Sequence, residues 1–146
     1  MNWLTKEPKG MAIAKLIMVV IIIKFVYLMS TAATMVMVMG LQPRPMLEPQ
    51  YIRGWWFPLF ILVAAFAEEI MFRAPLVLPL IAKWPTRVTL TIALVFSLVF
   101  GMRHDGFHGI PLQGVAGFIY CLVFLKCGGI HGHYFKALGA STAAHA

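Results

Sequence analysis

Long apolar runs separated by short polar turns dominate the chain. The runs cover residues 14–40, 55–82, 88–104, 110–126 and 137–146. A helix needs about 20 apolar residues to cross a hydrocarbon core about 30 Å thick. The first four runs reach or approach that length, whereas the last does not. The pattern therefore predicts an all-α, polytopic transmembrane helix bundle with about four full spans plus a short C-terminal helix.

The turns divide the chain into two parts. Residues 41–54 contain three prolines and Gly54, which indicates a loop. We therefore expect residues 1–54 to form an N-terminal transmembrane helix with its loop, and residues 55–146 to form the core. The turn at 83–87 is short, so the helices on its two sides should be antiparallel neighbours.

Composition supports a membrane location. Hydrophobic residues make up 61% of the chain and charged residues 12%, and the mean hydropathy is +0.85. Soluble domains average about 45–50% apolar and about 25% charged residues. The apolar segment near the N-terminus has no small-residue cleavage site after it, so we expect a retained helix. We expect an integral, multi-pass protein of the bacterial inner (plasma) membrane, with the lipid bilayer as its partner.

We interpret the net charge of +7 as a signal for the orientation of the protein in the membrane, since the basic residues lie in loops and at helix ends without interleaved aromatics. That distribution argues against a nucleic-acid partner. The positive-inside rule favours a cytoplasmic N-terminus. That orientation places one larger basic set inside: Lys6, Lys9, Lys15, Lys83, Arg87, Lys126 and Lys136. It places Arg44, Arg53 and Arg103 outside. Cys121 and Cys127 have no CxxC spacing and are interpreted as small apolar helix residues.

Three charged residues interrupt the second apolar run: Glu68, Glu69 and Arg73. A charged side chain at the bilayer centre costs roughly 2.5–3.5 kcal/mol on insertion scales, so such residues are functional candidates. Glu69 and Arg73 are four apart and share a helix face, which predicts an ion pair. Glu68 is rotated about 100° away and is left for a proton or a water. A purely structural ion pair is the alternative.

Helix lengths place His104 at the depth of Glu68. Glu68 lies 15 residues before Lys83, and His104 lies 17 residues after Arg87. At about 1.5 Å per residue, both are about 22–26 Å from the same turn. The path through the later helices brings His145 toward this layer as well. We therefore expect these side chains to surround one polar cavity, together with Glu69 and Arg73.

Three motifs now resemble a known family. "EEIMFR" (68–73) matches EExxxR, "FGMRH" (Phe100 to His104) matches FxxxH, and "STAAHA" is similar to the start of a third motif, a histidine followed four residues later by asparagine. The pattern resembles the CPBP (Abi) family of CAAX proteases and bacteriocin-processing enzymes. The resemblance covers residues 55–146.

The resemblance implies an intramembrane endopeptidase that acts on a peptide or protein substrate near the membrane surface. It implies catalytic roles for Glu68, His104 and His145, with Glu68 as the general base, His104 assisting and His145 stabilising the oxyanion. Glu69, Arg73 and Phe100 would support them. The resemblance leaves the cofactor open between none and a divalent metal such as zinc, which, if present, would be held by Glu68, His104 and His145.

The third motif leaves an alternative open. Its asparagine would stand at position 149, past Ala146, so we expect either a truncated chain or a reduced family member. A non-catalytic bacteriocin-immunity or partner-binding membrane protein on the same scaffold is the leading alternative to a peptidase. A small ion or proton conductor using Glu68 is a third. Pairs of histidines, His104 with His108 and His131 with His133, are weaker metal candidates.

Overall fold

The computed structural model describes residues 2–40 and 56–146. The predicted proline-rich loop at 41–54, with Arg44 and Arg53, lies outside the described residues. Within them every regular element is a helix, as expected. The long helices are α2 (Met11–Met39), α4 (Phe57–Ile81), α5 (Thr86–Gly109), α6 (Val115–Lys126) and α7 (Tyr134–His145). The short ones are α1 (Asn2–Thr5), the π-helical turn η1 (Ile110–Gly114) and the 3-10 turn η2 (Gly129–His131).

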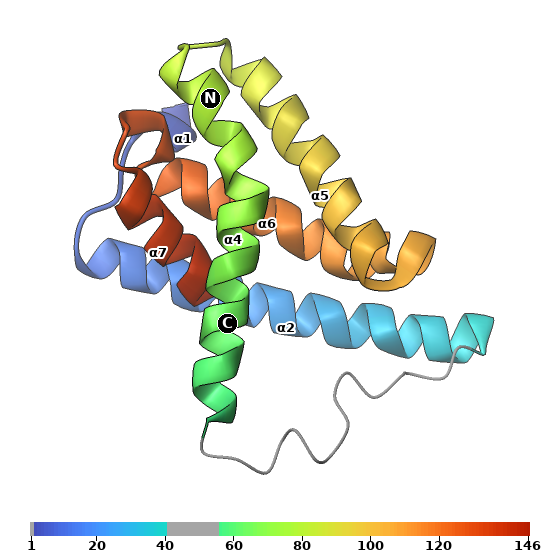
Figure 1. The fold of residues 1–146 in the computed structure, drawn as a ribbon. Coiled ribbons are helices and arrows are strands. Elements are labelled where there is room, and N and C mark those ends of the chain that lie inside the picture. Colours follow the sequence, from blue (N-terminus) through green and yellow to red (C-terminus); the bar gives the residue numbers. More distant parts are fainter. Residues whose placement is uncertain (1, 41–55) are drawn as a thin grey trace.

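The two central helices form the predicted antiparallel hairpin. Figure 1 shows α4 and α5 descending from one short turn, and α6 returning beside α5. Lys83 adopts a positive φ of 53° in that turn, which lets the chain reverse within a few residues. α7 packs against both α4 and α6, and α2 runs crosswise to α4 and contacts α7.

The sequence pattern places a short polar turn at residues 105–109 between two apolar runs, and the structure corrects this expectation. α5 continues through these residues to Gly109 and passes through η1 directly into α6. The chain folds back on itself so closely that a Cβ on Gly101 would lie 2.8 Å from the Gly109 carbonyl oxygen and 2.8 Å from the Gly114 nitrogen. Glycine at 101 therefore leaves the space that this close return of the chain requires.

Small residues allow α7 to approach the other helices. Its buried positions are Ala137, Ala140, Ser141, Thr142 and Ala144. Such residues let helix backbones approach closely inside a membrane. The core they join includes Leu76 from α4 and Cys121 from α6, both fully buried. Cys121 and Cys127 are buried free thiols, as the interpretation as apolar helix residues requires.

Much of the outer surface is apolar. Within the described residues, three segments are long and apolar enough to cross a membrane: Met11–Thr34, Thr86–His104 and Gly106–His131. α4 has a comparable length of 25 residues but carries three charged side chains near its middle. Large exposed hydrophobic side chains cover α2, α4 and α5, which suits contact with lipid.

The start of the chain is fastened to the end of the bundle where α6 finishes. Lys126, the last residue of α6, donates hydrogen bonds to the backbone carbonyls of Trp3 and Lys6, and its ammonium lies 4.7 Å from the centre of the Trp3 ring. Glu7 accepts a 2.6 Å hydrogen bond from Lys136 of α7. Several of the basic residues assigned to one side of the membrane therefore lie at one end of the molecule.

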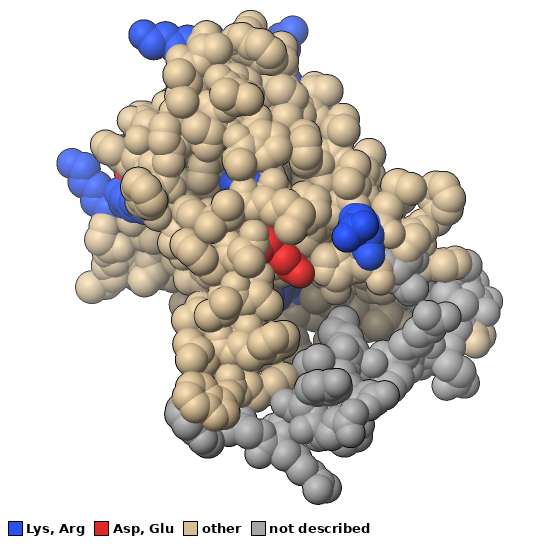
Figure 2. Space-filling view, in the orientation of Figure 1, with Lys and Arg blue, Asp and Glu red and all other residues tan. Residues whose placement is uncertain are grey.

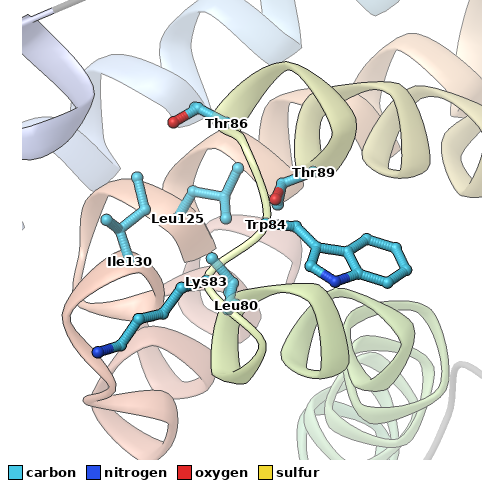
Figure 3. A pocket seen from close by; sticks show the side chains of 7 residues that line it. All are labelled: Leu80, Lys83, Trp84, Thr86, Thr89, Leu125 and Ile130. Atoms are coloured by element: carbon cyan, nitrogen blue, oxygen red, sulfur yellow. The ribbon is translucent and has the colours of Figure 1, made fainter.

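A cavity of about 230 Å³ lies beneath the α4–α5 turn (Figure 3). Its lining residues are Leu80, Lys83, Trp84, Thr86, Thr89, Leu125 and Ile130. None of the residues expected at the functional site lines it. The charged cluster thus lies outside this cavity.

Candidate active site

A buried ion pair forms the base of the site. Glu69 and Arg73 are 1% and 3% exposed, and Arg73 Nη2 lies 2.8 Å from Glu69 Oε1. Arg73 also donates to the Gly117 carbonyl of α6 at 3.3 Å. The Ser141 hydroxyl of α7 donates to the other Glu69 oxygen. Breaking such a pair would leave a buried charge uncompensated, so it ties α4 to α6 and α7.

His145 lies between the two adjacent glutamates. Its Nδ1 is 3.2 Å from Glu69 Oε1, and its Nε2 is 3.5 Å from Glu68 Oε2. The Tyr120 ring of α6 stacks on the imidazole, with ring centres 4.6 Å apart and planes inclined by 23°. These contacts hold the ring at the end of α7 and aim Nε2 at Glu68.

His104 approaches Glu68 from the opposite helix of the hairpin. Its Nδ1 lies 2.8 Å from the carbonyl oxygen of Phe100, one turn earlier in α5, and its Nε2 is 3.9 Å from Glu68 Oε1. The Phe100 ring is buried, and its centre lies 4.3 Å from that of His104 and 5.8 Å from that of His145. Phe100 thus packs against both imidazoles and also supplies the acceptor that orients one of them.

The hydrogen bonds assign the tautomer of both rings. A backbone carbonyl and a carboxylate can only accept, so Nδ1 carries the proton in His104 and in His145. In its neutral form, each Nε2 then presents a lone pair to the Glu68 carboxylate. Three acceptors meeting at one point need a proton, a water or a cation between them. Protonating an imidazole instead turns its Nε2 into a donor toward Glu68 or toward an oxygen bound beside it.

One part of the site is buried and the other is exposed. Glu69 and Arg73 are sealed, whereas the Glu68 and His104 side chains are 35% and 34% exposed. Figure 2 shows acidic atoms beside α4 at the centre of a face that is otherwise mostly uncharged. Of the two glutamates, Glu68 is therefore the one that can be reached from outside. The site is thus an open cluster on this side, where the sequence predicted a cavity within the bundle.

The donor types match those of zinc sites. One carboxylate and two imidazoles form a common ligand set for catalytic zinc, and each imidazole has its second nitrogen held by a carbonyl or carboxylate, as metal-bound histidines usually do. Among the described residues, however, no group of three or more His, Cys, Asp or Glu side chains is arranged to hold a metal ion. The histidine pair His131 and His133, a weaker metal candidate in the sequence, is also not part of such a group: His133 contacts Glu7, with Nδ1 3.2 Å from Oε1.

The geometry brings together every residue to which the resemblance assigns a catalytic or supporting role. Glu68, Glu69, Arg73, His104 and His145 form one connected cluster, with Phe100 packed against it. The separation of 3.9 Å between Glu68 and His104 agrees with the equal depths expected along the hairpin.

Two supporting residues were missed. Ser141 precedes His145 by four residues, so helical spacing alone could have placed its hydroxyl on the same face. Tyr120 had no such signal, because its stacking depends on how α6 packs against α7.

Comparison with known proteins agrees with this site. The family model described as "type II CAAX prenyl endopeptidase Rce1-like" matches residues 50–146. Searches of curated proteins and of solved structures found no match. The matched segment includes α4 to α7 and all of the clustered residues. Since it spans well over half of the sequence, the chain belongs to the Rce1-like family of type II CAAX prenyl endopeptidases.

Proposed function

We propose that this chain is a membrane-embedded endopeptidase that hydrolyses a peptide bond near the membrane surface with a water activated by Glu68. The observation that carries the proposal is the position of the Glu68 carboxylate, 3.5 Å from His145 Nε2 and 3.9 Å from His104 Nε2. These separations exceed direct hydrogen bonds, and they are short enough for one water or substrate oxygen to bridge the groups.

In the proposed reaction, Glu68 accepts a proton from the water as its oxygen bonds to the scissile carbonyl carbon. His145 in its protonated form donates to the oxyanion, and His104 assists from the other side. Glu68 then gives its proton to the leaving nitrogen as the carbon–nitrogen bond breaks. Glu69, neutralised by Arg73, keeps the His145 ring oriented and stabilises its positive charge.

The substrate class is part of the proposal. A prenylated C-terminal peptide, as in CAAX processing, is favoured by the family match. A leader or bacteriocin peptide is the second class. Glu68 is partly exposed, and large hydrophobic side chains of α4 such as Phe66, Ile70 and Met71 are exposed on the same helix, which would suit a membrane-bound substrate of either kind.

Glu68, His104 and His145 supply the donor types that a divalent metal such as zinc would need, although their arrangement in this structure is not that of a metal site. A metal bound there would polarise the carbonyl as a Lewis acid. Orientation of the imidazoles by Glu69 and by the Phe100 carbonyl would be the same. Metal analysis of the purified protein, combined with activity before and after chelation, distinguishes the two forms of the mechanism.

We place the protein in the bacterial inner membrane with a cytoplasmic N-terminus. The contacts of Lys126 with Trp3 and Lys6, and of Lys136 with Glu7, gather basic residues at one end, which supports a single basic side. Cysteine labelling in the segment 44–50 tests this assignment. Absence of labelling from outside intact cells would reverse it.

Glu68→Gln tests the function. The amide keeps the shape of the side chain but cannot accept the proton, so cleavage of a membrane-tethered reporter should fall by about 100-fold or more, the usual contribution of a general base. The protein should still fold and insert. Glu7→Gln, which removes a carboxylate outside the site, should retain activity.

Reporters with a prenylated CAAX end and with a leader peptide should be run in parallel. Full cleavage by Glu68→Gln would refute the mechanism. If the wild-type chain cleaves neither reporter and a partner protein co-purifies with it, the non-catalytic alternative is favoured.

A further inference from the structure

A single cation lies in the middle of α2. Lys24 is the one charged residue between positions 16 and 39, in a helix whose surface is mostly exposed and apolar. A lysine at that depth is costly and is normally paired with a polar group inside the bundle. Its partners therefore indicate what the position is for.

The Lys24 ammonium reaches the end of α7. It donates to the backbone carbonyl of His145 at 2.9 Å and to that of Ala144 at 3.3 Å. It also lies 5.4 Å from the centre of the Tyr120 ring, within cation–π range. Tyr120 in turn stacks on the imidazole of His145, a proposed catalytic residue, with ring centres 4.6 Å apart.

We propose that Lys24 is a positioning residue for His145, so that α2 completes the active site. The inference rests on the proposed function. It adds a residue from outside the segment 50–146 that matches the family model. Glu69 contacts Nδ1 of the His145 imidazole, and Tyr120 stacks on the face of that ring. Lys24 holds the backbone that carries the ring.

Loss of this contact should lower the reaction rate, because a catalytic group tolerates only a small displacement. Catalytic groups need placement within about 0.5 Å, and a 1 Å displacement can cost about 100-fold in rate. Without Lys24, the backbone carbonyls of Ala144 and His145 lose the ammonium that donates to both of them. The imidazole Nε2 would then no longer be held beside Glu68.

Lys24→Met keeps the length and apolar stem of the side chain and removes the donor. We expect kcat to fall by about 10- to 100-fold, as for other residues that orient a catalytic group, with KM almost unchanged. Lys24→Arg should restore most of the rate, since guanidinium can also donate to both carbonyls. Lys15→Met, an exposed lysine on the same helix, is the matched control and should behave as wild type.

A purely structural lysine would give another result. Yield and melting temperature would fall, and kcat per folded molecule would be unchanged. The removal of a charge from a membrane helix should instead leave the yield equal or higher. A wild-type kcat in folded Lys24→Met would overturn the positioning role of Lys24. If Glu68→Gln is inactive in the same assay, the proposed function of the protein would still stand.

A second measurement needs no activity. In the Glu68→Gln background, diethyl pyrocarbonate modification of His145, which is 15% exposed, is followed by mass spectrometry with His104 as the internal reference. Lys24→Met should raise the rate at His145 relative to His104, because the end of α7 is released. An unchanged ratio would refute the positioning role even if no reporter is cleaved by any form.

Discussion

Glu68 and Glu69 are consecutive glutamates with opposite surroundings. Glu69 is sealed among Arg73, Ser141 and His145, whereas Glu68 is about one third exposed, at 35%, and faces both histidines. The difference arises from the helix, which rotates successive side chains by about 100°. One carboxylate therefore becomes structural and the other is available for chemistry.

Glu69→Gln should be a folding variant rather than a simple loss of activity. It leaves Arg73 as an unpaired buried cation, and breaking a buried pair from one side costs about 3–5 kcal/mol. Yield in the membrane and melting temperature in detergent should both fall. Glu69→Gln combined with Arg73→Met removes both charges and should recover part of the yield. A wild-type melting temperature for Glu69→Gln alone would contradict the buried-pair interpretation.

At the scale of the elements, the crossing of α5 and α6 decides where Phe100 lies. Gly117 of α6 sits against its ring, so closely that an added Cβ would be 2.9 Å from Phe100 Cδ1. Phe100 in turn contacts both imidazoles. Helix packing at a glycine is thereby connected to the position of the two proposed catalytic histidines.

Gly117→Ala should therefore reduce activity. The new methyl group must displace the Phe100 ring, and overpacking of this kind costs about 1–3 kcal/mol. We expect a lower melting temperature and a lower kcat, because the carbonyl that orients His104 belongs to Phe100. Gly139→Ala is the matched control, since a Cβ there meets nothing within 4 Å. Equal kcat values for the two variants would refute this link.

At the scale of the whole molecule, a polar contact joins the first residues to α7. Glu7 lies 2.6 Å from Lys136 and 3.2 Å from His133. Hydrogen bonds from Lys136 and then from His133 lower the pKa of Glu7 from 4.5 to about 2. The contact lies outside the membrane-spanning segments and fastens the N-terminal segment to the helix that carries His145.

The lowered pKa predicts a pH dependence. A carboxyl group whose folded pKa is depressed stabilises the fold above its unfolded pKa, and loses that contribution as pH falls through the folded value. The contribution of Glu7 should be complete above about pH 4.5 and lost near pH 2. Thermal unfolding of wild type and Glu7→Gln should therefore differ near neutrality and converge in acid.

Lys136→Met supplies the control for that comparison. Since it removes the same contact, its effect should not add to that of Glu7→Gln. A constant difference in melting temperature between wild type and Glu7→Gln across the whole pH range would show that Glu7 acts by some other contact.

The features that the sequence alone determined are those governed by local backbone periodicity and by composition. Apolar content predicted an all-α membrane bundle, the spacing of Glu69 and Arg73 predicted their pair, and residue counts along the hairpin placed Glu68 level with His104. The ion pair and the equal depth follow from a rise and rotation per residue that are the same in any α-helix.

Tertiary structure decided the remainder, because those features depend on how distant helices pack. α5 continues through residues 105–109 and passes through η1 into α6, and this path brings Gly109 and Gly114 close to Gly101, a contact that no local pattern predicts. Stacking of Tyr120 on His145 required α6 to lie beside α7. Lys24 reaches His145 across 121 positions in the chain, and no local pattern encodes that contact.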